Sequence, residues 1–380
     1  MTYQSRWMTE DVQIFRNTVK QFIQREFVPH QARWREQHGP DNQAWLGAGR
    51  AGLLLADVPE QYKGGGGTFA HEAVVLEELA RANVHFGSGV QSMVGRYIVA
   101  YGSEGQKSKW LPNMASGELV AAIAMTEANA GSDLQGIKTT AKRDGNYYII
   151  HGSKTFITNG AHAGLICLAV KTEAKLLGMR GLSLIMVETK DLEGYRIGLP
   201  LQKIGMHGQD TCELSFDGVR IPVANLLGLQ EGKGFLQLME QLAYERLQIS
   251  VGAVASAELA VDITARHVRE RTAFGSTLMD LQNTRFKLAE CKTQAQVGRV
   301  FLDSCIERLI AGSLDDASVA MAKYWLTESQ CRIIDECLQL HGGYGYMVEY
   351  PIARMWADSR VQRIYAGTNE IMKELIACSL

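Results

Sequence analysis

The segment Ile364–Glu370 reads Ile-Tyr-Ala-Gly-Thr-Asn-Glu and places a small Ala-Gly-Thr turn directly before the apolar, helix-like stretch Ile371–Ile376. The first backbone N–H groups of a helix have no partners within the helix, and they suit a phosphate or a polarised carbonyl oxygen. The segment therefore predicts a turn that binds an anion or a carbonyl group.

A second stretch, Leu238–Ile263, has the apolar spacing of one helix face but carries a charge on that face. Its apolar positions are Leu238, Leu242, Ile249, Ala253, Ala260 and Ile263. Glu245 falls on the same stripe, three residues after Leu242 and four before Ile249. Because burial raises the pKa of a carboxyl group, Glu245 is a candidate general base. A buried ion pair with an arginine on a neighbouring helix is the alternative.

Composition excludes several classes of function. The 380 residues include 39 basic and 41 acidic side chains, for a net charge of -2, so neither a nucleic-acid surface nor a basic membrane face is expected. No apolar run approaches the roughly 18 residues of a membrane span, and the first residues show no signal-like apolar core. We expect a cytoplasmic bacterial protein, with the mitochondrial matrix as the less favoured location.

The cysteines and histidines give no sign of a metal site. The seven cysteines include no Cys-x-x-Cys pair, and the nine histidines lack zinc-ligand spacing. We therefore expect reduced thiols that are buried as small apolar side chains, and no metal.

Three regions follow from the change in hydrophobic period along the chain. Residues 1–118 are predicted to be helical, 119–228 to form short antiparallel strands in a sandwich or barrel, and 229–380 to form long bundle helices. The expected strands are Leu119–Met125, Tyr147–Ile150, Leu165–Val170, Leu182–Glu188 and Thr211–Phe216. The expected long helices are Leu238–Arg269, Leu281–Ala311 and Leu314–Leu340. The fold class is α+β.

Two details of the first region are open to test. Thr9 is a plausible N-cap of a helix that Pro29 ends. Gly64–Gly67 could cradle a phosphate, but it lacks the Gly-Lys-Ser/Thr ending of a P-loop, which favours a plain turn.

Two small polar loops are candidates for binding a flat heterocycle. Met125–Asp133 leaves a predicted strand with Thr and Ser hydroxyls beside a glycine, and Phe156–Gly160 follows about two dozen residues later. Either loop alone is more often a plain turn whose polar groups form hydrogen bonds within the protein.

These motifs together resemble the acyl-CoA dehydrogenase family over essentially the whole chain. Most of that family has its catalytic Glu in the terminal motif, where this chain has Ala366. The isovaleryl- and long-chain-type branch takes the base from the earlier helix instead, which matches Glu245 in Tyr-Glu-Arg-Leu. The run Gln339–Ile376 is most similar to the long-chain type. The resemblance implies a helical N-terminal domain, a middle β domain and a C-terminal four-helix bundle.

The resemblance also implies an FAD site. Within one chain, the expected FAD-binding residues are Met125, Thr126, Phe156, Ile157, Thr158, Thr368 and Glu370. Met125 and Thr126 would meet the edge of the isoalloxazine ring, and Thr158 would lie near its reactive nitrogen. Many relatives have Trp where this chain has Phe156, which keeps an aromatic face but lacks the indole N–H. The expected substrate-binding residues are Ser132, Arg246, Ala366 and Gly367.

A further set completes the expected FAD site. Arg271, Phe274 and Gln282 resemble the segment that reaches the FAD of a neighbouring subunit, and Gln339, Gly342 and Gly343 resemble the loop on the adenine side of the FAD. The glycine tract at 342–345 could also be no more than a helix-ending turn. If the match holds, each FAD site draws on two chains, and the family is usually tetrameric.

By the same resemblance, Glu245 removes the α-proton of a saturated acyl-CoA and the flavin accepts the β-hydride. The thioester oxygen would be stabilised by the Ala366 N–H and an FAD hydroxyl, and the electrons would pass to an electron-transfer flavoprotein. A carrier-protein thioester as substrate, a flavin monooxygenase or oxidase, and a non-enzymatic FAD- or acyl-binding protein remain as alternatives. Acyl length and branching stay open.

Overall fold

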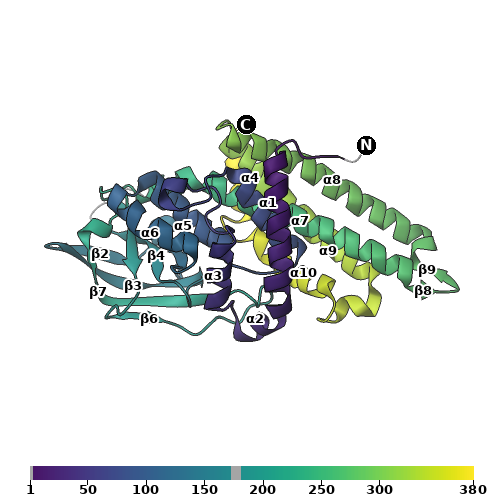
Figure 1. The fold of residues 1–380 in the computed structure, drawn as a ribbon, viewed down its shortest axis with the longest axis horizontal. Coiled ribbons are helices and arrows are strands. Elements are labelled where there is room, and N and C mark those ends of the chain that lie inside the picture. The colour runs from purple at the N-terminus through teal and green to yellow at the C-terminus, as the bar shows by residue number, and fades with distance from the viewer. Residues whose placement is uncertain (1–2, 173–180) are drawn as a thin grey trace.

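The computed structural model describes residues 3–172 and 181–380, and their helices and strands follow one another in three blocks (Figure 1). The first block is helical. Its helices are α1 (Glu10–Phe22), α2 (Gln31–Gln37), α3 (Asn42–Arg50), α4 (Phe69–Arg81), α5 (Ser88–Tyr101) and α6 (Glu104–Ser116).

The predicted start of α1 is correct, but the chemistry of its cap is not. Thr9 occupies the N-cap position, yet its hydroxyl bonds to the Asp11 carboxylate and not to a backbone N–H. After Phe22 the chain continues through one π-helical turn, Ile23–Phe27, and a short 3₁₀ turn that contains Pro29. The buried side chains of this segment line one side of it, as an amphipathic helix requires.

The Gly64–Gly67 loop is a tightly packed turn. The N–H groups of its last three residues donate to the carbonyl oxygens of Leu55, Val58 and Ala56 at 2.9–3.0 Å. A Cβ atom added at Gly64 would lie 2.3 Å from the Val58 oxygen, so the close approach requires glycine. Because these N–H groups already have acceptors, the loop is not a phosphate cradle.

The second block is one hydrogen-bonded sheet of seven strands. The strands are β1 (Ala121–Ala124), β2 (Thr140–Asp144), β3 (Tyr147–Thr158), β4 (Leu165–Lys171), β5 (Leu182–Glu188), β6 (Tyr195–Ile197) and β7 (Thr211–Pro222). Their order is β1-β4-β2-β3-β7-β6, with β5 also paired to β4. The pairings β1–β4 and β2–β4 are parallel, so the prediction of a purely antiparallel sheet is wrong at these two places. The sequence reading also missed β2 and β6.

Strand β4 is buried on both sides, which is why it reads as a continuous apolar run. Leu165, Cys167 and Ala169 face a core that includes side chains of α5 and α6. Ile166 and Leu168 face the opposite core, shared with β3 and β7. The sheet is thereby fixed against the first helical block, and the ends of β1 and β3 lie next to α5.

The third block contains three long helices, α7 (Gly234–Glu270), α8 (Gln282–Ile310) and α9 (Asp316–Leu340), which pack against one another. Between α7 and α8 lies a small hairpin of β8 (Thr272–Ala273) and β9 (Ser276–Thr277). The shorter α10 (Pro351–Ser359) and α11 (Asn369–Ala377) pack on α9, and α4 crosses α7. The expected bundle is therefore built from three long helices and two short ones.

Helix α7 is long and apolar enough, by composition alone, to cross a membrane, which the sequence reading did not anticipate. Its most apolar 18-residue window has a mean hydropathy of 1.3, but 67% of that window is buried inside the protein. Such burial is that of a core helix in a folded domain. The same burial gives Glu245 its surroundings.

Candidate active site

Glu245 lies on α7 with only 3% of its surface exposed, facing α5. The hydroxyl of Tyr97 on α5 donates a hydrogen bond of 2.8 Å to Glu245 Oε1. Burial raises the pKa of Glu245 to about 7, although the Tyr97 hydrogen bond and the Arg246 charge both lower it. A carboxyl group with this pKa is divided between its two protonation states near neutral pH, as a general base requires.

Arg246 connects Glu245 to the turn at Ala366–Gly367. Its side chain is 6% exposed, and its Nε donates to the Ala366 carbonyl oxygen at 3.4 Å. The structure therefore brings together the two stretches that the sequence reading selected separately. Arg246 faces this turn and not open solvent, so its expected contact with CoA stays a prediction.

The turn itself has a backbone shape that presents N–H groups. Ala366 and Gly367 have φ values of 51° and 89°, which an L side chain rarely adopts. No acceptor for either N–H lies among residues 3–172 and 181–380. Thr368 caps α11 by accepting from the Ile371 N–H at 3.4 Å. The turn is thus fixed by the cap while its two N–H groups are free to meet a carbonyl oxygen.

Lys323 on α9 holds the turn from behind and was missed by the sequence reading. Its buried Nζ donates to the Gly367 carbonyl oxygen at 2.7 Å and to Asn369 Oδ1 at 2.9 Å. Burial, together with the nearby Arg246 charge, lowers the pKa of Lys323 to about 8. A lysine inside an apolar helix pattern was the available signal, but its partner is 44 residues away in the chain.

The two polar loops lie side by side at the ends of β1 and β3. The Thr155 N–H donates to the Thr126 carbonyl oxygen at 2.9 Å, and Lys154 Nζ donates to the Met125 carbonyl oxygen at 2.9 Å. Phe156, at the β3 bulge, has a φ of 60° and is 67% exposed. The expected partners of the flavin ring are therefore together in one place.

Thr126, Thr158 and Ile157 differ in what they can offer a ligand. The side chains of both threonines are half-buried, and neither hydroxyl has a hydrogen-bond partner in the described part of the chain. Ile157 is 2% exposed and packs in the sheet core, so only its backbone is available to a cofactor.

Glu127 fixes the first loop from inside and was also missed. Its carboxylate accepts from Lys154 Nζ at 2.8 Å, from the Lys138 and Thr139 N–H groups at 2.7 and 3.0 Å, and from the Thr139 hydroxyl at 2.6 Å. Ser132 is exposed beyond this anchored part of the loop.

The second set of predicted FAD residues gathers at the other end of the molecule. Arg271, Phe274, Gln282, Gln339, Gly342 and Gly343 are all exposed. The Arg271 guanidinium lies 5.4 Å from the centre of the Tyr344 ring, and the rings of His267 and His341 stack at 4.2 Å. Figure 1 shows the β8–β9 hairpin at one end of the long axis and β2, β3 and β7 at the opposite end. A single chain therefore does not bring the two sets together.

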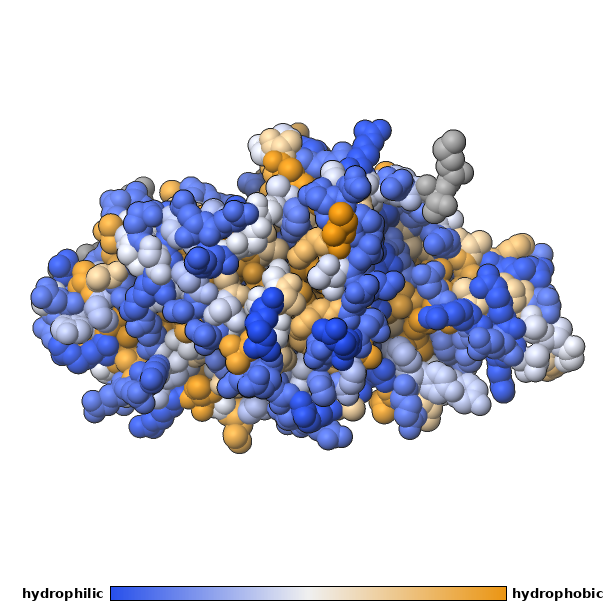
Figure 2. Space-filling view, viewed as in Figure 1, coloured by the Kyte–Doolittle hydropathy of each residue, from blue (hydrophilic) through white to orange (hydrophobic). Residues whose placement is uncertain are grey.

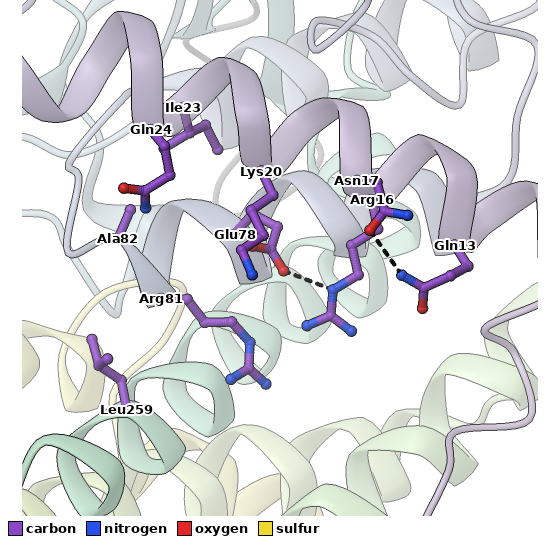
Figure 3. Close-up of a pocket in the computed structure, with 10 residues that line it drawn as sticks. All are labelled: Gln13, Arg16, Asn17, Lys20, Ile23, Gln24, Glu78, Arg81, Ala82 and Leu259. Atoms are coloured by element: carbon purple, nitrogen blue, oxygen red, sulfur yellow. Dashed lines mark hydrogen bonds and ion pairs between the residues drawn. The ribbon is translucent and has the colours of Figure 1, made fainter. Parts of the chain in front are cut away.

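A different hollow, of about 390 Å³, lies between α1, α4 and α7 (Figure 3). Its lining is Gln13, Arg16, Asn17, Lys20, Ile23, Gln24, Glu78, Arg81, Ala82 and Leu259. Arg16 pairs with Glu78 at 2.7 Å and Arg81 pairs with Glu258, so its arginines are already neutralised. It contains none of the predicted site residues. Within the described residues, no three His, Cys, Asp or Glu side chains gather as a metal site would need.

The chain belongs to the acyl-CoA dehydrogenase family. It matches the family models of the N-terminal domain over residues 9–118, the middle domain over 122–219 and the C-terminal domain over 232–380. It is an oxidoreductase of the class that dehydrogenates acyl-CoA with FAD.

The sequence similarity to named relatives extends over nearly the full chain. The mitochondrial long-chain specific acyl-CoA dehydrogenase of Sus scrofa is 44% identical over 376 residues, covering 98% of this chain and 87% of that protein. The crystal structure of an acyl-CoA dehydrogenase from Geobacillus kaustophilus has 45% identity and a TM-score of 0.97, and 99% of each chain is covered. A glutaryl-CoA dehydrogenase from Mycobacterium smegmatis in complex with FADH2 has 26% identity and a TM-score of 0.91, covering 98% and 95%.

The residues present fit a flavin. Threonine hydroxyls without partners, an exposed aromatic face and free backbone N–H groups are the groups that a ring rich in carbonyl and nitrogen atoms requires. Thr126, Phe156 and Thr158 offer them at the β1–β3 loops. The Thr368 cap places the free N–H groups of the terminal turn beside Arg246.

Proposed function

We propose that this chain dehydrogenates a saturated long-chain-type acyl-CoA to the trans-2-enoyl-CoA, with Glu245 as the base. The observation that carries the proposal is the buried Glu245 carboxylate, bonded to Tyr97 and linked through Arg246 to a turn with free N–H groups. A base and a carbonyl-binding turn are the two groups that removal of an α-proton from a thioester needs.

Each group has a defined part in this chemistry. Glu245 takes the proton from the α-carbon, and the N–H of Ala366 donates to the thioester oxygen as enolate charge develops. Lys323 and the Thr368 cap hold that N–H in place through the Gly367 carbonyl and the start of α11. FAD, when bound, supplies the acceptor for the β-hydride.

The preference for a long chain rests on similarity. The relative from Sus scrofa is named for long-chain substrates and covers nearly all of this chain. Glu245 on the earlier helix, together with Ala366 in the terminal turn, is the arrangement expected of the long-chain and isovaleryl-type branch.

We also propose that each FAD lies between two subunits of a homotetramer. Phe274 is 96% exposed, and Phe286, Val297 and Val300 of α8 are each about half exposed or more. Figure 2 shows apolar side chains near the middle of the visible face and over its helical half. Apolar surface of this kind on helices supports burial against other subunits.

Electron-transfer flavoprotein is the electron acceptor that we propose for the reduced enzyme. The support is membership of the family together with the fit of the flavin loops. Coupled reduction of this acceptor in the presence of an acyl-CoA, and its absence without one, tests this part separately.

The deciding experiment is anaerobic mixing of the holoenzyme with saturated acyl-CoAs of several lengths and with carrier-protein thioesters, followed by flavin absorbance. Glu245→Gln should slow bleaching by about 10³-fold, because a positioned general base contributes roughly 10²–10⁴-fold. Glu240→Gln is the matched control, since Glu240 is an exposed carboxylate on the same helix that bonds to Tyr101.

Three results would overturn the proposal. Equal bleaching in wild type and Glu245→Gln would reject the base. Bleaching by carrier thioesters alone would reject the CoA substrate. A bound flavin that no thioester reduces would reject the reaction.

A further inference from the structure

Tyr97 is completely buried at the junction of α5, α7 and β4, and the hydroxyl is the only polar group of its side chain. That hydroxyl lies 2.8 Å from Glu245 Oε1. Burial, with the nearby Glu245 charge, raises the pKa of Tyr97 well above 10, so the phenol keeps its proton and donates. The direction of the hydrogen bond is therefore fixed when Glu245 is ionised.

We propose that Tyr97 is a positioning residue, which holds the Glu245 carboxylate in one orientation and stabilises its ionised form before substrate is bound. This inference rests on the proposed function of Glu245 as the base. It assigns to α5 a part in the reaction that neither the site motifs nor the family relationship indicated.

The other groups near Glu245 form no hydrogen bond with its carboxylate among the described residues. Cys167 on β4 is a buried neutral thiol, because burial and the Glu245 charge raise its pKa to about 12. Arg246 follows Glu245 on α7, but its Nε donates to the Ala366 carbonyl oxygen, and it also faces the charges of Asp316 and Lys323 on α9. In the part of the chain that the structure describes, Tyr97 is the side chain that donates a hydrogen bond to Glu245.

The size of the expected effect follows from the chemistry of carboxylates. One good hydrogen bond to an ionised carboxylate lowers its pKa by about one unit. Without Tyr97, the pKa of Glu245 should rise from about 7 toward ~8. At pH 7 the ionised fraction would then fall about fivefold.

The chain offers a matched control one helical turn away. Tyr101 lies on α5 as well, but its hydroxyl donates to Glu240 at 2.6 Å and accepts from Gln241 at 3.1 Å. Tyr101→Phe removes the same hydroxyl from the same helix without touching Glu245. Tyr97→Phe keeps the ring in the core and removes only the donor.

The first measurement is the pH dependence of flavin reduction by the best acyl-CoA, in the holoenzyme. Tyr97→Phe should move the acid limb of the rate profile upward by about one pH unit, slow reduction about fivefold at pH 7, and recover most of the rate at pH 9. Tyr101→Phe should follow the wild-type profile. A merely structural loss would lower the rate equally at every pH.

The second measurement needs no substrate. The protonated-carboxyl infrared band of Glu245, identified by its loss in Glu245→Gln, is followed against pH in both tyrosine variants. Its midpoint should rise by about one unit in Tyr97→Phe and stay in place in Tyr101→Phe.

The outcomes separate the two proposals. An unmoved infrared midpoint in Tyr97→Phe, or an equal shift in Tyr101→Phe, would overturn the assignment of Tyr97. If no acyl-CoA reduces the flavin, the proposed function fails on its own, while the infrared titration still decides whether Tyr97 orients and stabilises the Glu245 carboxylate.

Discussion

The two halves of the predicted FAD site are built in opposite ways. The loops at Met125–Asp133 and Phe156–Gly160 are fixed within the chain, where the buried Glu127 accepts four hydrogen bonds and Lys154 joins β3 to the first loop. The β8–β9 hairpin and the glycine tract at 342–343 meet where the Arg271 guanidinium lies over the Tyr344 ring, and their predicted FAD-binding residues are exposed.

In the second half of the site, the aromatic side chain of Phe274 is exposed to solvent. Phe274 is 96% exposed with a φ of 53°, and Cβ atoms added at Gly342 and Gly343 would meet no atom within 4 Å. A side chain as exposed as Phe274 gains little packing from its own subunit. The difference fits our proposal that the first half is complete when the chain folds and that a second subunit completes the other.

Lys154→Met should have the largest effect, because it disrupts the first half of the FAD site, which is fixed within one chain. The change leaves Glu127 buried without its cation, and breaking a buried ion pair costs about 3 kcal/mol or more. Burial alone would raise the pKa of Glu127, but Lys154, Thr139 and the Lys138 N–H together lower it. We expect the free energy of unfolding of the subunit to fall by about 3 kcal/mol in denaturant titrations, with loss of bound FAD.

Lys142→Met on the exposed side of β2 is the control for this prediction. Lys142 is exposed, so its replacement should change the free energy of unfolding by no more than about 0.5 kcal/mol. Equal stability of the two variants would show that the first loop does not depend on its buried pair.

The same contrast explains what could be predicted from the sequence. The hydrophobic period and the turn residues between segments located the three blocks, and β5 has the predicted bounds. Local sequence patterns decide which segments become helices or strands. Glu245 was found because a charge interrupts an apolar stripe. Tyr97, Lys154 and Lys323 were missed because each acts through a partner distant in the chain, and an apolar pattern gives no pairings.

Other errors have equally specific causes. Strand β2 has one buried residue in five and carries no apolar alternation to detect. The parallel pairing of β1 with β4 depends on how the sheet folds back on itself, which short strands do not encode. For the second half of the site, only the family resemblance gave a signal, because exposed residues carry no pattern of burial.

Phe274→Ala tests whether a second subunit completes the exposed half of the FAD site. Since Phe274 contacts solvent in one chain, the free energy of unfolding of the isolated subunit should change by less than about 0.5 kcal/mol. If a second subunit buries the ring over FAD, cofactor affinity should weaken by about tenfold or more. Equilibrium FAD titration and light scattering measure the two effects.

Ile14→Ala serves as the control, because Ile14 is 62% exposed on α1 and far from the hairpin in sequence. It should leave both cofactor affinity and assembly unchanged. Unchanged FAD affinity in Phe274→Ala as well would mean that the exposed half is complete without a partner.

Glu72 tests whether every carboxyl group buried within the chain is stabilising. Glu72 of α4 is fully buried and accepts from Ser92 at 2.8 Å and from Gln248 at 3.0 Å. Burial, with the nearby Asp57, raises the pKa of Glu72 to about 8, against an ordinary value of 4.5. Between these two values the folded chain keeps a proton that the unfolded chain loses, so Glu72 lowers stability as pH rises.

Glu72→Gln should remove that dependence. Between about pH 5 and pH 8 the free energy of unfolding should fall less steeply in the variant, by up to about 1.4 kcal/mol per pH unit. Glu60→Gln, at an exposed carboxyl outside this cluster, should follow the wild-type slope. Parallel slopes for wild type and Glu72→Gln in denaturant titrations across this range would show that Glu72 is ionised in the folded chain.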